Sequence, residues 1–362
     1  MRVALVHDYL VQGLRGAERV LAVLHDMWPA APIYTLVHDP VAMGPEFADW
    51  DVRPSFIQRL PGGVRHYQKL IALMPAAIER LRLDEYDLVV SDSSAWTKSA
   101  RQREGATHVC YCHSPARFLW HWSEEYINSL DASRLAKGLA KAWLPGLRRW
   151  DKRTAGRPTH LIANSGAVRD RIRRYWERDA EVIHPSVDTD SFLPEDCDED
   201  YYLAVAALNA YKKVDLAVET FTQLGKPLVV IGDGPLRRQI EQSAGPTVRL
   251  LGKVSEDELR RHYARCRAFV MPQEEDFGLA PVEAMSAGRP VIAYGAGGAL
   301  ETVVADETGV FFDRQTPASV ADAVARFERL SFSKVRCRER AREFDTERFK
   351  QRFSAFVDDA MA

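Results

Sequence analysis

The stretch 274–293, EEDFGLAPVEAMSAGRPVIA, decides the fold of the second half of the chain. We expect a loop at its start, a helix over residues 281–286 and a buried strand over residues 290–294. Pro281 suits the first turn of a helix, because its missing N–H group would have no partner there. Gly288, followed by Pro290, ends the helix.

The same stretch predicts a binding site. A loop that leads into a helix N-terminus presents unpaired backbone N–H groups and the positive end of the helix dipole, so Phe277, Gly278 and Leu279 are expected to bind an anion such as a diphosphate. The carboxylates of Glu275 and Glu283 cannot hold phosphate. They are expected to accept hydrogen bonds from neutral hydroxyl groups, and sugars carry many such groups.

Length and composition indicate a folded protein of two domains. A chain of 362 residues exceeds what one hydrophobic core usually organises. Its 46% of hydrophobic and 28% of charged residues are ordinary globular values. The net charge of −2 conceals a basic region, because residues 133–178 contain 13 Lys and Arg against 3 Asp and Glu.

The cysteines and the apolar runs indicate the compartment. The 5 cysteines are odd in number and scattered, without the spacing of a metal site, so a reduced, cytoplasmic protein is expected. The apolar run within residues 1–8 is too short for a signal peptide, and no stretch of 18 apolar residues exists. A membrane-spanning protein is therefore not expected.

Apolar runs alternate with helical patterns, which predicts a doubly wound α/β sheet in each half. The predicted strands cover residues 2–7, 32–38, 87–91, 108–113, 160–164, 181–185, 201–208, 227–232, 248–252, 268–271 and 290–294. An acidic, unpatterned segment over residues 187–200 separates the halves as a linker. We therefore expect domains at residues 1–190 and 200–340.

Ligands of such sheets bind at the carboxyl ends of the strands, where His7, Ser91, His113 and Asn164 fall. His113 stands out because a loop over residues 114–122 follows it, in which a proline breaks any helix and aromatic side chains can wall a pocket. A histidine at a strand end is more often a structural group than a catalytic one. The position alone leaves both roles open.

Two further loops are candidates for phosphate binding. Gly13 and Gly16 open a helix that runs to about residue 27, but the dinucleotide-binding pattern Gly-x-Gly-x-x-Gly is absent. Lys212, in the loop 209–215, is expected at the carboxyl edge of the second sheet. There it would lie opposite the loop that carries Glu275, which we call the carboxylate loop. There it can neutralise a departing diphosphate, although a lone lysine is explained equally by surface solubility.

Two tight turns can read a nucleotide base through backbone groups. They lie at residues 231–235, with Gly232, and at residues 251–255, with Gly252, Lys253 and Val254. Their glycines allow close approach of a ligand, but ordinary turns use the same residues.

Residues 132–157 interleave Leu and Trp with Lys and Arg. Such a basic amphipathic segment can lie on an anionic lipid surface, at the inner face of a membrane if the acceptor is lipid-borne. The alternative is a helix packed on its own sheet with a solvated basic face. A nucleic-acid partner is not expected, because no binding motif accompanies the segment and the isoelectric point is near 6.6.

The two glutamates and their surroundings resemble the donor-site signature of the retaining glycosyltransferases of family 4. Phe-Gly-Leu-Ala-Pro lies between Glu275 and Glu283, Met-Pro-Gln precedes this motif, and Ala-Met-Ser-Ala-Gly-Arg-Pro-Val follows it. The resemblance spans nearly the whole chain. Segments that look like the O-antigen mannosyltransferase-like branch are HDY at 7–9, APIYTL at 31–36, YCHSP at 111–115, IANS at 162–165 and YK at 211–212.

The resemblance implies a GT-B fold, in which two Rossmann-like doubly wound domains face each other across a cleft. It also implies that the last helix, at about residues 340–362, packs back on the first domain. The implied reaction moves a hexose, most readily mannose from GDP-mannose, from a nucleotide-sugar to a hydroxyl of a glycan or polyprenyl-diphosphate-linked acceptor, with retention. Polysaccharide, lipopolysaccharide or O-antigen biosynthesis is the implied setting. No cofactor or metal is expected, since no strand end carries an Asp-x-Asp triplet.

The resemblance also assigns roles. Glu275 would hold sugar hydroxyls, Glu283 the ribose, and His113 the far side of the sugar ring. Lys212 would neutralise the departing diphosphate, and Gly16 would approach the same group.

One position departs from the family pattern. Ala207 stands where many members carry an arginine before the lysine, so another cation must substitute for it or the site lacks one. Two alternatives to a transferase therefore stay open: a donor-binding but inactive partner of another transferase, and a nucleotide-sugar epimerase of the same fold.

Overall fold

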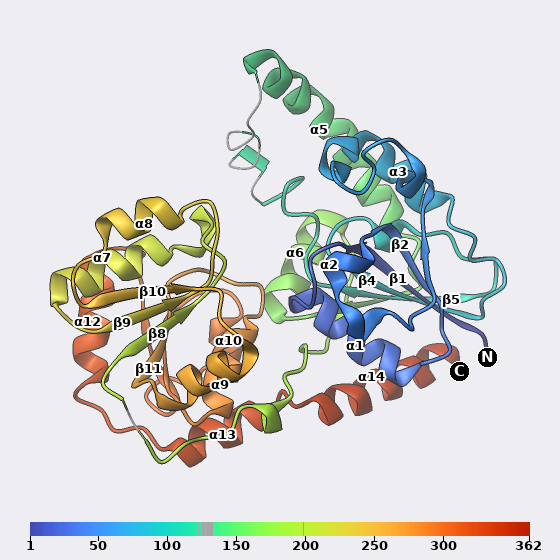
Figure 1. Cartoon of the computed structure of the whole chain (residues 1–362). Helices are drawn as coiled ribbons and strands as arrows, with labels where there is room; N and C mark the ends of the chain where they lie inside the picture. The colour runs from blue at the N-terminus through green and yellow to red at the C-terminus, as the bar shows by residue number, and fades with distance from the viewer. Residues whose placement is uncertain (122, 125–126, 128–132, 198) are drawn as a thin grey trace. The chain divides into compact units, whose positions relative to one another are not determined.

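The computed structural model of the chain describes residues 1–121, 123–124, 127, 133–197 and 199–362 (Figure 1). The chain divides into two compact units, one of residues 1–184 with 350–362 and one of residues 185–349. Two residues of the predicted segments, Trp122 in the aromatic loop and Ala132 in the basic segment, lie outside the described residues.

The first unit is built on a seven-stranded parallel sheet of order β3-β2-β1-β4-β5-β6-β7. Its five inner strands are almost entirely buried, as in a parallel sheet covered on both faces, and only the edge strands β3 and β7 carry exposed residues. The edge strand β3 was not expected from the sequence. The strands are β1 (Val3–Leu10), β2 (Ile33–His38), β3 (Val52–Pro54), β4 (Leu88–Ser93), β5 (Thr107–Cys112), β6 (His160–Ala163) and β7 (Glu181–Val182).

The helices of the first unit connect these strands over the faces of the sheet (Figure 1). Helix α6 shows how the sequence starts one: the Ser165 side chain accepts a hydrogen bond from the Val168 N–H group. The α-helices are α1 (Gly16–Met27), α2 (Pro40–Met43), α3 (Met74–Glu79), α5 (Arg134–Thr154) and α6 (Gly166–Trp176), and the 3-10 helices are Pro45–Phe47, Phe56–Arg59, Tyr67–Leu73 and Thr97–Ser99. Helix α14 (Thr346–Met361) begins in the second unit and ends in the first.

The second unit has a six-stranded parallel sheet of order β10-β9-β8-β11-β12-β13. Apolar residues of α9, α10 and α13 form one core on one face, and those of α7, α8 and α12 form a second core. The strands are β8 (Tyr202–Val205), β9 (Leu228–Ile231), β10 (Val248–Gly252), β11 (Ala268–Met271), β12 (Val291–Tyr294) and β13 (Gly309–Phe312). The helices are Thr189–Ser191 and Ala210–Lys212 (3-10), α7 (Val214–Leu224), α8 (Arg237–Ser243), α9 (Glu256–Arg265), α10 (Leu279–Ser286), α11 (Ala299–Thr302), α12 (Pro317–Phe327) and α13 (Lys334–Arg342).

The stretch 274–293 folds into the expected loop, helix and strand. Helix α10 begins at Leu279, earlier than residue 281, because Gly278 turns the chain with a positive φ of 88° and Pro281 fits inside the first turn. Gly288, at a φ of 77°, follows the helix. The helix shows little amphipathicity because residues 281–286 are all buried.

The division between the units falls before the acidic segment, not within it. Pro185 already belongs to the second unit, and Val187 and Phe192 are buried in its core. The backbone N–H group of Val187 donates to the carbonyl oxygen of Phe344 at 2.9 Å. The start of the expected linker is therefore part of a folded unit.

Both sheets have a topological switch point, where the strand order reverses. In the first sheet the chain builds outward from β1 to β3 on one side and from β4 to β7 on the other, so the switch lies between β1 and β4. In the second sheet it lies between β8 and β11. Ligands of open α/β sheets bind at the carboxyl ends of such strands, so these two places are where functional side chains are expected.

A helix that crosses a bilayer must be long and predominantly apolar. Within the described residues, no helix combines the necessary length with a sufficiently apolar sequence.

Candidate functional site

Lys212 and Glu275 meet at the switch point of the second sheet. Lys212 lies in the loop after β8 and Glu275 in the loop after β11, and these two strands are direct neighbours. The ammonium group of Lys212 donates a hydrogen bond to Oε1 of Glu275, and Nε2 of Gln273 donates to the same oxygen at 3.1 Å. The side chains of Lys212 and Glu275 keep 18% and 15% of their surface exposed. The cation and the carboxylate singled out in the sequence therefore form one partly accessible pair.

A glycine-rich loop after β12 holds the carboxylate loop in place. The N–H group of Gly298 donates to the carbonyl oxygen of Glu275 at 2.9 Å, and Glu275 and Gly297 form a short parallel bridge. A Cβ atom on Gly298 would lie 2.2 Å from the Cα and O atoms of Phe277, and one on Gly297 would lie 2.2 Å from the O atom of Glu275. Only glycine fits at either position. The run Gly-Ala-Gly-Gly directly after a predicted strand is the signal that indicates this support.

The N-terminus of α10 offers the expected anion-binding groups. Gly278 precedes the helix and no side chain caps it. The ring of Phe277 is buried and packs against Phe344, at 5.4 Å between ring centroids, so it anchors the loop to the core. Glu283 is also buried and accepts a hydrogen bond from the Tyr263 hydroxyl group at 2.8 Å. Glu283 thus has a protein partner of its own, distinct from the pair that Lys212 and Glu275 form.

Gly232 and Gly252 lie on neighbouring strand ends and contact each other. The N–H group of Gly232 donates to the carbonyl oxygen of Gly252 at 2.8 Å. Gly232 has a φ of 137°, and a Cβ atom there would lie 1.9 Å from the O atom of Ala206. Close approach to the Ala206 backbone is therefore sufficient reason for Gly232, and a positive φ of 73° is sufficient reason for Gly252. Of their neighbours, Lys253 is exposed and Val254 is partly buried against the core.

One further cation lies beside this edge. A Cβ atom on Gly252 would be 2.6 Å from a guanidinium nitrogen of Arg237, so this side chain lies against the second turn. Arg237 pairs with Glu241 at 2.7 Å and lies 3.7 Å from Asp233. Ala207, where the family pattern has an arginine, is exposed. Sequence reasoning did not single out Arg237, because its position at the start of α8 is typical of an ordinary exposed helix residue.

His113 lies at the switch point of the first unit, where it contacts Asp92, which in turn contacts His7. It follows the last residue of β5, as expected, and its Nε2 atom lies 2.5 Å from Oδ1 of Asp92. Oδ2 of Asp92 lies 2.9 Å from Nδ1 of His7. His7 and Asp92 are register partners in β1 and β4, so their side chains point to the same face. Asp92 was missed in the sequence, although it directly follows the candidate Ser91.

Other predicted positions of the first unit have different surroundings. Ser91 lies inside β4 and is buried, and its hydroxyl group is 2.8 Å from Nε2 of His108. Burial and the nearby Arg157 lower the pKa of His108 to about 3, so this ring is neutral and structural. Asn164 accepts a hydrogen bond from the Ser165 hydroxyl group at 3.0 Å. Gly16 is the exposed first residue of α1, a helix without a side-chain cap.

Asp8 fixes the chain where it leaves β4. Its carboxylate accepts hydrogen bonds from four consecutive backbone N–H groups, those of residues 94–97, at 2.7, 2.7, 2.9 and 3.1 Å. Such a nest of amides holds a buried carboxylate without a cation. The turn after Asp92 is therefore rigidly attached to β1.

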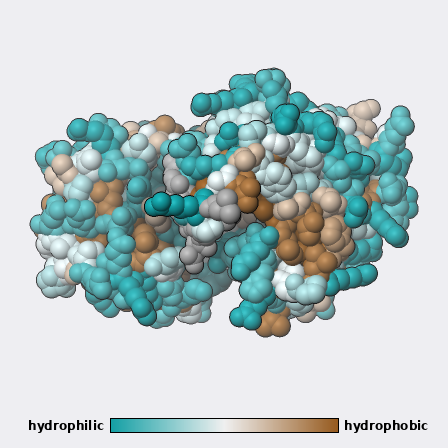
Figure 2. Space-filling model, turned by 90° about the horizontal axis from the view of Figure 1, so that it is seen from above, coloured by the Kyte–Doolittle hydropathy of each residue, from teal (hydrophilic) through white to brown (hydrophobic). Residues whose placement is uncertain are grey.

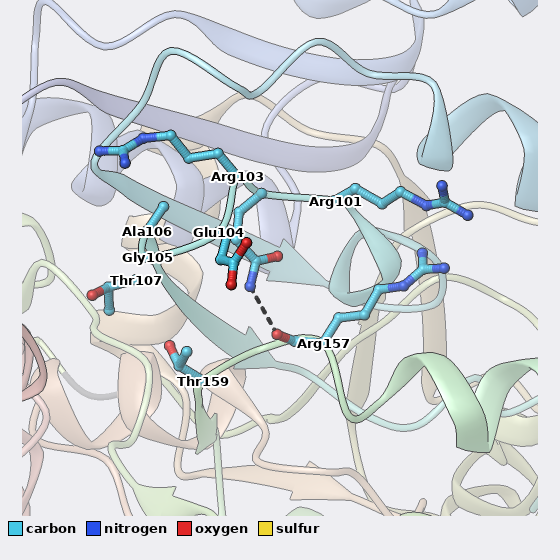
Figure 3. A pocket seen from close by; sticks show the side chains of 9 residues that line it. Arg101, Arg103, Glu104, Gly105, Ala106, Thr107, Arg157 and Thr159 are labelled. Atoms are coloured by element: carbon cyan, nitrogen blue, oxygen red, sulfur yellow. Dashed lines mark hydrogen bonds between the residues drawn. The ribbon is translucent and has the colours of Figure 1, made fainter.

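The cavity of about 710 Å³ in Figure 3 is not part of this arrangement. It lies before the first residue of β5, at the amino ends of the strands, and Arg101 and Arg157 extend to one side of it while Arg103 extends to the other (Figure 3). Arg101 and Arg157 pair with Glu79, at 2.6 and 2.8 Å, and Arg103 pairs with Asp87 at 2.7 Å. Neither its place in the sheet nor its neutralised cations suit a nucleotide diphosphate.

Comparisons with known proteins identify the family and the fold. The family model "Glycosyl transferases group 1" matches residues 189–344, and "Glycosyltransferase Family 4" matches residues 14–191. A GDP-mannose-dependent alpha-(1-6)-phosphatidylinositol monomannoside mannosyltransferase of Mycobacterium tuberculosis is 31% identical over 175 residues, 40% of this chain and 46% of the relative. The O-antigen chain mannosyltransferase RfbU of Salmonella typhimurium is 29% identical over 39% of this chain and 43% of the relative.

A solved structure shows the fold over the full length. HepE of Anabaena, in complex with UDP and glucose, superimposes with a TM-score of 0.71 over 98% of this chain and 99% of its own, at 16% identity. Together with the two parallel sheets, this likeness confirms the predicted fold class, two Rossmann-like α/β domains of the GT-B kind. The chain spans about half the length of the curated relatives it matches.

Proposed function

The chain belongs to glycosyltransferase family 4, and on this premise we propose that it transfers a hexose, with retention, from a nucleotide-sugar to a hydroxyl group of a glycan or lipid-linked glycan. The contact between Lys212 and Glu275 supports this proposal most directly. It places a cation and a hydrogen-bond acceptor side by side, next to an uncapped helix N-terminus. A nucleotide-sugar needs the cation and the N–H groups for its diphosphate and the carboxylate for its sugar hydroxyls.

The favoured donor is GDP-mannose. Two relatives support this choice, because both are named as mannosyltransferases and one as GDP-mannose-dependent. Lipopolysaccharide or a related polysaccharide is the setting that the Salmonella relative suggests.

The proposed mechanism follows from where charge develops. The bond between the anomeric carbon and the phosphate oxygen breaks while the acceptor hydroxyl oxygen bonds to the same carbon, and the hydroxyl proton passes to the departing phosphate. The ammonium group of Lys212 and the N–H groups at residues 277–279 stabilise the negative charge of that phosphate. Asp92 is a carboxylate at the switch point of the first unit, but it is buried and both its oxygens bond to imidazoles. It is therefore not placed to act as a nucleophile, which supports attack on the face that the phosphate leaves.

A donor screen tests the proposal. The purified protein is incubated separately with GDP-mannose and UDP-glucose, and the products are separated by chromatography. Slow release of free hexose and nucleoside diphosphate is expected of a transferase without acceptor. Conversion to an isomeric nucleotide-sugar would identify an epimerase instead, and tight binding without turnover would identify an inactive partner.

Contact with an anionic lipid surface is part of the proposal, because α5 has two unlike halves. Near its C-terminal end Asp151 is buried and pairs with Lys98 at 2.8 Å, which fixes this half to the unit. Its N-terminal half exposes Leu139 (65%) and Trp143 (45%) next to the exposed Lys141. In Figure 1 this half projects from the unit, and Figure 2, which views the molecule from that side, shows brown patches among teal. Apolar side chains flanked by lysines suit a lipid interface.

Liposome flotation tests the lipid contact. The wild type is expected to float with vesicles that contain anionic lipid and not with neutral ones. The double variant Leu139→Ser, Trp143→Ser should lose this property, whereas Val41→Ser, which removes an apolar side chain that is 92% exposed on α2, should retain it. Equal flotation of all three proteins would show that α5 is not the contact.

A further inference from the structure

Four titratable side chains form a line across the switch point of the first sheet. Its inner members are His7 and Asp92, and its outer members are His113 and Glu18. Oε1 of Glu18, in the first turn of α1, lies 3.9 Å from Nε2 of His7. His7 therefore lies between two carboxylates, and Asp92 lies between two imidazoles.

The charges of the inner pair follow from these contacts. Burial alone would lower the pKa of His7, but the hydrogen bond to Asp92 and the negative charges of Asp92 and Glu18 raise it to about 10. Burial alone would raise the pKa of Asp92, but its contacts with His113 and His7 lower it. At neutral pH His7 is therefore an imidazolium that neutralises the Asp92 carboxylate.

The second oxygen of Asp92 determines the state of His113. A carboxylate only accepts hydrogen bonds, so the Nε2 atom of His113 must carry the hydrogen of the contact between them. In a neutral imidazole the other nitrogen is then an acceptor. Among the described residues, Nδ1 of His113 has no hydrogen-bond partner. The His113 side chain is also more exposed, at 13%, than those of His7 and Asp92, at 3% and 1%.

The ring of His113 is also held from a second side. Tyr111 packs edge-on against it, with 5.3 Å between ring centroids. A hydrogen bond at one nitrogen and a ring contact together fix both the plane and the tautomer of an imidazole, so the free nitrogen points in a defined direction.

We propose that Asp92 is a positioning residue, which holds His113 as its Nε2–H tautomer and so presents Nδ1 as an acceptor for one hydroxyl group of the transferred sugar. This inference rests on the proposed function. An acceptor fixed in this way selects a sugar that carries a hydroxyl hydrogen at that point. His7, neutralising Asp92 from the other side, keeps the carboxylate ionised inside the protein. Asp92 acts through His113 and does not touch the sugar.

Nuclear magnetic resonance measures the tautomer directly. Nitrogen-15-labelled histidine is incorporated into the full chain, and the His113 signals are assigned by their loss in His113→Gln. The wild type is expected to show a protonated Nε2 and an unprotonated Nδ1. In Asp92→Asn the Nδ1–H tautomer should become populated, because the new amide can donate to Nε2. A protonated Nδ1 in the wild type would overturn the proposal, and this result does not depend on whether any variant folds.

Kinetics separate a positioning role from a merely structural one. Asp92→Asn is expected to lower kcat roughly ten- to hundredfold, the scale of a misplaced reacting group, with the Kd for GDP unchanged. Asp87→Asn makes the same change at the amino end of β4, where Asp87 pairs with Arg103 on the surface, and should keep the wild-type kcat. An unchanged kcat in folded Asp92→Asn would overturn the proposal. If the wild type transferred no sugar at all, the proposed function would fail, and the tautomer experiment would still decide on Asp92.

Discussion

The two switch points of this protein occupy the same place in two similar sheets but are built in opposite ways. In the second unit the candidate side chains, Lys212 and Glu275, lie in loops, keep part of their surface exposed and carry opposite charges. In the first unit, His7 and Asp92 lie within strands, are buried and neutralise each other. The partly exposed pair of the second unit is suited to exchanging its contacts for contacts with a charged ligand. The buried pair of the first unit is suited to holding one group, His113, in a fixed position.

The largest effect is expected from substitutions that break the partly exposed pair of Lys212 and Glu275. Glu275→Ala and Lys212→Ala should each lower kcat roughly a hundredfold or more, the scale seen when one preorganised contact to a transition state is lost. Steady-state assays with the donor found in the screen measure this. Lys226→Ala is the matched control, because Lys226 precedes β9 at the opposite edge of the same sheet and pairs with Glu328 at 2.7 Å. Wild-type rates in both site variants would show that the donor binds elsewhere.

The two switch points also differ in how far the sequence predicts them. Lys212 and Glu275 were found because a local motif surrounds each of them. The contact between His7 and Asp92 joins residues 85 positions apart and depends on the register of two strands, which no local pattern shows. Glu18 was missed for the same reason, since only packing of α1 brings it near His7.

The fold itself was largely predictable. Strands β10 and β11 were predicted with their observed limits, because both are short apolar runs bounded by Gly252 and by the proline after Met271. The edge strand β3 was missed, because it has only 3 residues and two of them, Arg53 and Pro54, are exposed. The sequence predicts that the first strand ends at His7. In the structure β1 continues to Leu10, so His7 and Asp8 lie inside the strand and not at its end.

A smaller effect is expected from a substitution in the glycine-rich loop after β12, which holds the carboxylate loop in place. Gly298→Ala places a methyl group against the Phe277 backbone, so the carboxylate loop must move. We expect a loss of about 1–3 kcal/mol in the free energy of unfolding and a fall in kcat/KM. Urea denaturation and the donor assay measure the two. Gly156→Ala, where the nearest atom would be 3.4 Å away, is the control. Full activity in Gly298→Ala would mean that the loop tolerates displacement.

The buried pair should show itself in the pH dependence of stability. The pKa of His7 is about 10 in the folded protein, above its usual value of 6.5, because Asp92 and Glu18 face it. Its contribution to stability is therefore complete below pH 6.5 and is lost as the pH rises through about 10. Tm should fall over this range in the wild type, by about 2–4 °C for each kcal/mol lost, and fall less in His7→Gln. Parallel curves for the two proteins would contradict a charged His7.

Removal of divalent cations is expected to leave the rate unchanged, because the positive charge that faces the diphosphate is supplied by Lys212 and the N-terminus of α10. If Lys212 and the N-terminus of α10 neutralise the departing diphosphate, a divalent cation is not required for that step. Initial rates should then be the same in the protein as purified and after dialysis against EDTA. Added Mg²⁺ or Mn²⁺ should not raise the rate of Lys212→Ala beyond that of the wild type. Loss of activity on dialysis, with recovery on adding either cation, would show that a metal shares this charge, and the second unit would then not neutralise the diphosphate with its own groups alone.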